Sequence, residues 1–172
     1  KVKLMNPEVQ TLAQQIIGEA FGTFLEENPA AGKAIVQKCL TSAVDRSFNC
    51  LTVDGDMSTN DTVLLLSNGA SGGPEIRENT PQCEAFQDAL DAVCVELAKA
   101  IARDGEGASK YVEVRVINAA TREDARAAAM AIGNSALVKT AVFGQDPNWG
   151  RILCAAGRSG ARILPERVNL SV

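Results

Sequence analysis

Residues 51–66, LTVDGDMSTNDTVLLL, set six short polar side chains between two apolar runs. The flanking segments 49–53 and 62–67 have the length and apolar content of short, largely buried strands. Gly55 follows Asp54, and an Asp-Gly pair favours the positive φ of a tight turn. The stretch therefore predicts two strands joined by a polar corner, and with them a β component in the fold.

A calcium loop is the alternative interpretation of this stretch. An EF-hand that starts at Asp54 would need glycine at position 6 and a carboxylate at position 12. Thr59 and Leu65 stand there. Short polar side chains such as Asp and Ser can instead bond to neighbouring backbone N–H groups. A self-bonded corner that supports an active site is therefore preferred over a metal loop or direct chemistry.

The rest of the chain alternates helical and strand-like patterns. Helical spacing of apolar residues predicts helices over 6–28, 32–46, 86–101, 121–133 and 146–156. Thr121 and Asp146 are the expected N-caps of the last two helices. Strands are predicted over 112–116 and 137–143, and a strand-like apolar run over 168–172. Residues 67–82 predict a surface loop. The fold class expected is α+β.

Composition excludes several classes of function. The chain has 172 residues, a net charge of −4 and no histidine. Without histidine, Ser-His-Asp and Cys-His catalysis and most zinc sites within this chain are excluded. The acidic balance and the absence of a basic stripe argue against nucleic acid. No apolar run approaches the roughly 20 residues that span a bilayer, so no membrane association is expected. The five cysteines form no CxxC pair and are expected to be reduced thiols.

The segment 103–110, RDGEGASK, is a candidate binding site. Glycine on both sides of Glu106 allows close backbone approach and leaves the carboxylate unshielded. Such a carboxylate suits the ammonium group of an amino acid, and Arg103 and Lys110 lie nearby in sequence. A helix C-cap at Gly105, followed by a tight turn, explains the same glycines without a ligand.

A second candidate is the segment 143–160, FGQDPNWGRILCAAGRSG. Asn148 and Arg151 would lie at a helix N-terminus, where anions bind readily. Capping by Asp146 together with a Trp149 in the core is the preferred interpretation.

Three long stretches, AVDRSFNCLTVDGDMSTNDTVLLLSNG, RDGEGASKYVEVRV and NSALVKTAVFGQDPNWGRI, carry a family resemblance. In this order and spacing they resemble the bifunctional ornithine acetyltransferase / glutamate N-acetyltransferase family of arginine biosynthesis. The match extends from about residue 40 to about residue 168. It implies a layered helix–sheet–sheet–helix arrangement of the self-cleaving type.

The resemblance also implies an activity. Family members cleave themselves before a threonine, which becomes the first residue and the nucleophile of the beta chain. That threonine takes acetyl from N-alpha-acetylornithine and passes it to glutamate, in a ping-pong reaction through an acetyl-threonine. No metal or other cofactor is expected, although acetyl-CoA serves some members as acetyl donor. The implied partners are the alpha chain of the same precursor, within a larger hetero-oligomer, and the two amino-acid substrates. The expected location is the cytoplasm, or the mitochondrial matrix or plastid of a eukaryote.

Carried over to this sequence, the resemblance assigns one substrate-binding residue, Glu106, which holds the amino-acid portion of the substrate. Gly105, Gly107 and Lys110 are expected to support it. Asp54, Asp56 and Arg151 receive no catalytic role. The nucleophile and the oxyanion hole are expected outside this chain, because it starts at Lys1 instead of threonine.

The family's C-terminal binding segment is expected beyond Val172. The domain prediction is therefore that 1–172 form a single domain, or the major part of a beta chain that is incomplete at both ends. Two alternatives remain at this point: a related self-cleaving aminopeptidase or acyltransferase with another substrate, and a non-catalytic ligand-binding subunit.

Overall fold

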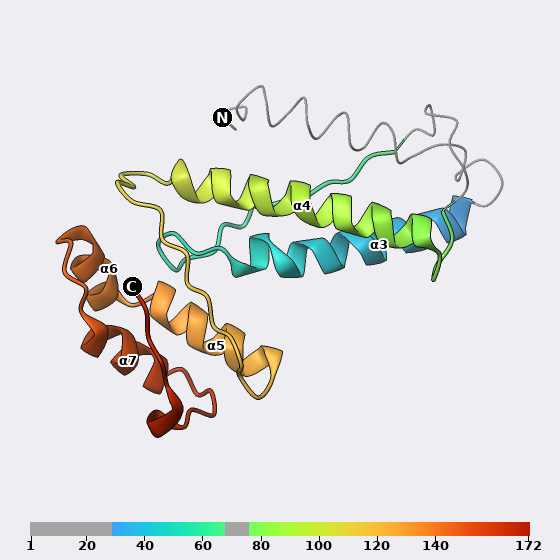
Figure 1. Cartoon of the computed structure of the whole chain (residues 1–172). Coiled ribbons are helices and arrows are strands. Elements are labelled where there is room, and N and C mark those ends of the chain that lie inside the picture. Colours follow the sequence, from blue (N-terminus) through green and yellow to red (C-terminus); the bar gives the residue numbers. More distant parts are fainter. Residues whose placement is uncertain (1–28, 68–75) are drawn as a thin grey trace. The chain divides into compact units, whose positions relative to one another are not determined.

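The computed structural model describes residues 29–67 and 76–172. Its regular elements in these ranges are helices (Figure 1): α3 Pro29–Arg46, η1 Phe48–Cys50, α4 Pro81–Arg103, α5 Arg122–Gly133, α6 Ala136–Phe143, α7 Trp149–Gly157 and η2 Pro165–Arg167. The helices predicted over 32–46, 86–101 and 121–133 are therefore confirmed. The helix predicted over 6–28 lies outside the described residues, as do positions 68–75 of the predicted loop.

The chain forms two compact units. The first takes in Lys1–Leu51 and Ser58–Ile101, and the second Thr52–Met57 and Ala102–Val172. The second unit therefore includes a six-residue piece of the stretch 51–66, far upstream of its remaining residues. The prediction of a single domain over 1–172 stays a prediction.

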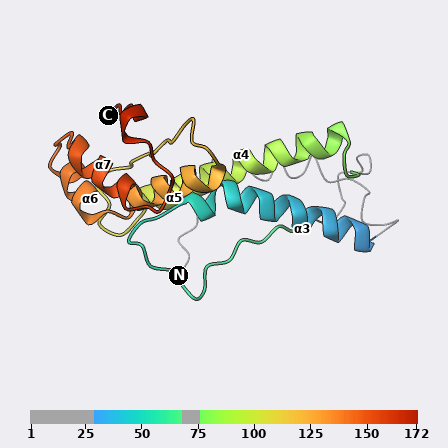
Figure 2. The ribbon, with the colours of Figure 1, turned by 90° about the horizontal axis from the view of Figure 1, so that it is seen from below.

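The first unit is built on α3 and α4, which lie side by side and run in the same direction (Figure 1 and Figure 2). Near the middle of α3, Gln87 Nε2 donates to the Cys39 carbonyl oxygen at 3.1 Å. At the end of α3, Arg46 Nη1 meets Asp91 Oδ2 at 2.6 Å. The residue numbers of the contacts thus increase along both helices, from Cys39 and Gln87 to Arg46 and Asp91, as in a parallel pair.

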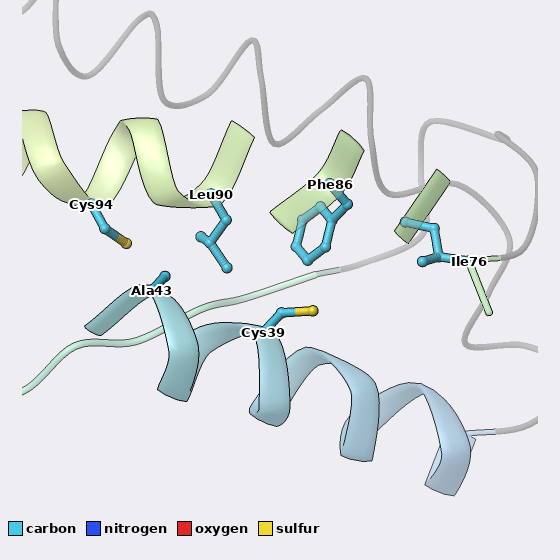
Figure 3. Close-up of a cluster of buried hydrophobic side chains, with 6 residues drawn as sticks. All are labelled: Cys39, Ala43, Ile76, Phe86, Leu90 and Cys94. Carbon is cyan, nitrogen blue, oxygen red and sulfur yellow. The ribbon is translucent and has the colours of Figure 1, made fainter. Parts of the chain in front are cut away.

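In the core between these helices, small side chains of α3 face mostly larger side chains of α4. Figure 3 shows Cys39 and Ala43 of α3 facing the longer side chains of α4, with Ile76 at the end of the row. The α4 side chains in this core are Phe86, Leu90 and Cys94. Their four-residue spacing places them on one face of α4, because a helix turns every 3.6 residues.

Burial affects the thiols in this core. It raises the pKa of the Cys39 thiol to about 11, with the neighbouring Cys83 as the next cause. Burial likewise raises the pKa of the Cys94 thiol above its ordinary value. All five cysteines are free, although Cys50 and Cys154 are exposed.

The second unit packs three short helices around a smaller core. Ile132 of α5, Val138 of α6 and Ala155 of α7 form it, and Val114 packs against it from the preceding segment. Thr121 caps α5 by accepting a hydrogen bond from the Asp124 N–H at 3.0 Å, as the sequence predicts.

The predicted α+β class and its layered helix–sheet–sheet–helix arrangement are wrong for the structure described, because residues 29–67 and 76–172 contain no strand. No strand forms at the predicted positions 49–53, 62–67 and 112–116, nor over the apolar run 168–172. Residues 48–50 instead form the short 3-10 helix η1. A strand exists only when a neighbouring strand pairs with its N–H and C=O groups. Instead, Leu64 and Leu66 stand 75% and 80% exposed.

The strand predicted over 137–143 is a helix, α6. Its Val and Thr content favours a strand by propensity. However, Val138 and Ala141 are buried at helical spacing, and the Ser135 hydroxyl accepts from the Val138 N–H at 3.4 Å, which caps the helix. Tertiary burial and the cap thus outweigh local propensity.

Candidate functional site

The polar corner within residues 51–66 is held by its own side chains. Asp54 Oδ1 accepts from the Asp56 N–H at 2.9 Å, around a Gly55 with φ of +92°. Further along, Ser58 Oγ accepts from the Asn60 N–H at 3.1 Å. The described residues contain no group of three or more metal-binding side chains. The prediction of a self-bonded corner is confirmed, and these polar groups serve local structure.

Residues 52–55 are also fastened to the α5–α6 corner. Thr52 Oγ1 donates to Asn134 Oδ1, just after α5. One residue later, the ammonium of Lys139 on α6 donates to the Val53 carbonyl oxygen at 2.6 Å. Two side chains from the α5–α6 region therefore hold consecutive residues of the corner.

Glu106 stands at the tip of a tight turn. The Ala108 N–H donates to the Gly105 carbonyl at 2.9 Å, which makes Glu106 and Gly107 the central residues of the turn. Gly107 has φ of +70°, while Glu106 has no positive φ. This is the type II pattern, which requires glycine or asparagine at the third position. The Glu106 side chain is exposed at the position where such a turn projects furthest.

Gly105 has a different task. A Cβ at this position would lie 3.0 Å from Val53 Cγ1 and 3.4 Å from the Ala102 carbonyl oxygen. The absence of a side chain therefore lets Val53 pack against the backbone of the turn. Gly105 does not have the positive φ of a glycine that ends a helix in the left-handed conformation. The interpretation of Gly105 as a helix C-cap is therefore wrong, and its close contact with Val53 explains the glycine instead.

The ends of this loop are drawn together. The guanidinium of Arg103, the last residue of α4, lies over the Tyr111 ring, 4.8 Å from its centroid. Lys110, one residue earlier, is exposed. A cation over an aromatic ring is attracted to its π face, so Arg103 serves to close the loop that carries Glu106.

The second candidate segment has a structural role in this fold. Asn148, not Asp146, caps α7, and its Oδ1 accepts from the Arg151 N–H at 3.2 Å. Asp146 Oδ2 instead accepts from Asn148 Nδ2 at 2.9 Å, which orients the cap. The predicted cap is therefore wrong by two residues, because Asp146 orients the cap residue Asn148 and does not itself cap α7.

Arg151 and Trp149 also differ from the expectations for this segment. Arg151 Nη1 donates to the Leu137 carbonyl at 3.1 Å and to Thr140 Oγ1 at 3.2 Å, so its guanidinium holds α7 to α6. Trp149 is 66% exposed and is not part of the core, contrary to the interpretation preferred from sequence.

The structure thus brings together residues from all three motifs that carry the resemblance. Val53 contacts both Gly105 and Lys139, and Lys139 lies 86 residues away from it in sequence. Sequence reasoning missed Thr52, Asn134 and Lys139. These residues lie within the first and third of the motifs, but no local pattern indicates which residue of one motif contacts which residue of another.

Comparison with known proteins matches residues 23–172 to the ArgJ family model. The chain belongs to the ArgJ family. It is 48% identical over 168 residues to the mitochondrial arginine biosynthesis bifunctional protein ArgJ of Schizosaccharomyces japonicus, covering 98% of this chain and 37% of that protein. It is 56% identical over 147 residues to the arginine biosynthesis bifunctional protein ArgJ of Symbiobacterium thermophilum, covering 86% and 37%.

A solved structure of the ArgJ family also resembles this one. The crystal structure of arginine biosynthesis bifunctional protein ArgJ from Bacillus halodurans aligns with a TM-score of 0.74 and 44% identity, over 76% of this chain and 62% of that chain. The chain spans 37% of the length of the first two curated relatives. The fungal relative carries a mitochondrial name. Within the described ranges no helix is long and apolar enough to cross a membrane.

Proposed function

We propose that this chain is part of an acetyltransferase of arginine biosynthesis that moves acetyl from N-alpha-acetylornithine to glutamate. The names of its relatives and the family match over 23–172 support this. In the first half-reaction a threonine hydroxyl, supplied from outside this chain, attacks the acetyl carbonyl and releases ornithine. In the second, the glutamate amine attacks the resulting acetyl ester and yields N-acetylglutamate.

The residues of this chain bind substrate in this proposal. Glu106 receives the side-chain ammonium group of acetylornithine, whose α-nitrogen carries the acetyl group, and Gly105 and Gly107 set the turn that presents Glu106. The observation that carries the assignment is the type II turn itself: its two glycines are needed for conformation and contact, while its tip is an exposed carboxylate. An exposed ion pair contributes little by itself, but substrate binding would exclude water and strengthen the pair.

The remaining parts of the site belong to partners in this proposal. The oxyanion donors come from the alpha chain of the same precursor, within a larger hetero-oligomer. The α-amine of the nucleophilic threonine serves as base, so no metal or cofactor is needed. Acetyl-CoA is a second acetyl donor to be tested in the same assay.

The test uses the complete two-chain enzyme. With acetylornithine and glutamate as substrates, Glu106→Gln should lower kcat/KM for acetylornithine about 10- to 100-fold, mainly through KM, which corresponds to roughly 1.4 to 2.7 kcal/mol. Glu166→Gln, an exposed glutamate of η2, is the matched control and should retain the kinetics of the unsubstituted enzyme.

Two results would contradict the proposal. Unaltered kinetics of Glu106→Gln would remove Glu106 from the binding site. An enzyme that ignores acetylornithine but turns over short peptides or other acylated amino acids would overturn the substrate assignment.

A further inference from the structure

We infer that Lys139 is a positioning residue for Glu106, acting through Val53 and Gly105; this rests on the proposed role of Glu106 in binding. Lys139 stands on the exposed side of α6, where a lysine ammonium is ordinarily solvated. Here its Nζ donates to the Val53 carbonyl oxygen at 2.6 Å. A short, charge-assisted bond to a carbonyl fixes that peptide more firmly than a neutral one would.

The next contact runs from Val53 to the turn. The carbonyl and the side chain of Val53 belong to one residue, so fixing its peptide also limits where Cγ1 can lie. That carbon stands 3.0 Å from the Cβ position of Gly105, which also lies 3.5 Å from Ala108 Cβ. Gly105 is therefore held between Val53 on one side and its own turn on the other.

The last link is the turn itself. The Gly105 carbonyl accepts the hydrogen bond that closes the turn, and Glu106 is the next residue. A displacement of Gly105 therefore moves Glu106 with it. The Glu106 side chain is exposed, so the position of its carboxylate depends on the position of the turn.

The expected loss is partial, because a second fastening remains. Thr52, the neighbour of Val53, keeps its hydrogen bond to Asn134 without Lys139. Removing Lys139 should thus loosen the position of the turn without unfolding the second unit. Lys139 contacts a backbone carbonyl and is proposed to contact no reacting atom, so its loss should change substrate binding more than chemistry.

The experiment is a double-mutant cycle in the complete two-chain enzyme, with acetylornithine as the varied substrate. Lys139→Met should raise KM about 5- to 10-fold and leave kcat within twofold. Lys139→Arg keeps a charged donor, so its rise in KM should be at most half that of Lys139→Met on a logarithmic scale. Lys33→Met, an exposed lysine of α3, is the control and should leave both constants unaltered.

Coupling separates a positioning role from a merely structural one. If Lys139 acts through Glu106, Lys139→Met should add less than a twofold rise in KM to Glu106→Ala. Independent, multiplying effects would overturn the inference, as would a KM unaltered by Lys139→Met while Glu106→Ala raises it. If Glu106→Ala leaves KM unaltered in an active enzyme, the proposed function of Glu106 fails first.

A second variant keeps the inference testable if Lys139→Met does not fold. Val53→Ala removes the carbon that packs on Gly105 and should produce the same rise in KM and the same coupling to Glu106→Ala. A Val53→Ala enzyme with unaltered KM would overturn the inference.

Discussion

The first unit joins two helices of 18 and 23 residues through an apolar row, whereas the second joins helices of 12, 8 and 9 residues through a smaller apolar core to which polar side chains add hydrogen bonds. A long helix can bury a continuous stripe of side chains over several turns. A helix of two or three turns buries few side chains, so caps and long polar side chains contribute more to holding short helices in place. Lys139 and Arg151 both bind carbonyl oxygens of other segments in this way.

This difference suits the placement of the candidate site. Hydrogen bonds to loop carbonyls fix the course of an irregular backbone, which an apolar core cannot do, because it has no directional preference. The turn of Glu106 belongs to the unit that uses such bonds. Binding residues often lie on loops that a firm scaffold positions.

The largest expected effect on stability would come from breaking the apolar row of the first unit. Phe86→Ala should lower the free energy of unfolding by about 3–5 kcal/mol, because it leaves a cavity between α3 and α4. Urea denaturation followed by circular dichroism and by alkylation of Cys94 would measure it. Phe143→Ala on α6, where the ring is 74% exposed, should cost less than about 0.5 kcal/mol. Equal costs for the two variants would refute this account of the core.

An intermediate effect should follow from pH. The native Cys39 thiol keeps its proton until its pKa of about 11, whereas the unfolded chain loses it near 9.0. Between these values the native state binds more protons, so stability falls as pH rises from about 9 to about 11. The loss attributable to this thiol is on the order of 2 kcal/mol.

The measurement is the free energy of unfolding at pH 8.5 and pH 11 for the unsubstituted chain and for Cys39→Ala. Because the variant has no thiol at this position, it should lose less stability over the interval. If the two chains lose the same amount, burial does not control the ionisation of Cys39.

The smallest effect concerns the second unit alone. Thr121→Ala removes the α5 cap and should cost about 1 kcal/mol. Hydrogen exchange at the Asp124 amide should accelerate, while exchange in α4 stays constant. Thr41→Ala in the interior of α3, whose hydroxyl bonds only back to Gln37, is the matched control with little or no expected cost. Faster exchange in α4 of Thr121→Ala would show that the two units do not open separately.

What the sequence could predict follows from how local each signal is. The helices over 86–101 and 121–133 were predictable because their apolar spacing and the Thr121 cap lie within a few residues of one another. The turn of Glu106 was predictable for the same reason, since both glycines adjoin it. The α6 helix was also signalled locally, by Ser135 and the spacing of Val138 and Ala141, but its β-branched residues favoured a strand.

The remaining errors concern partners distant in sequence. A strand such as 112–116 depends on a second strand that its own residues do not specify. Its alternation is visible only over 113–116, because Val114 packs inward and Glu113 and Arg115 stand exposed, whereas Val112 is 52% exposed. The contact of Lys139 with Val53 likewise depends on the assembled fold and could not be predicted from either motif.

The excursion of Thr52–Met57 into the second unit bears on the order in which a newly made chain can fold. Residues up to Ile101 suffice for the described contacts between α3 and α4, so the first unit can form while later residues are still being synthesised. The bonds from Thr52 to Asn134 and from Val53 to Lys139 close loops of 82 and 86 residues. Such closures are costly in chain entropy and come late. Residues 52–55 can therefore reach their final position only after α5 and α6 have left the ribosome, when the first unit can already be folded.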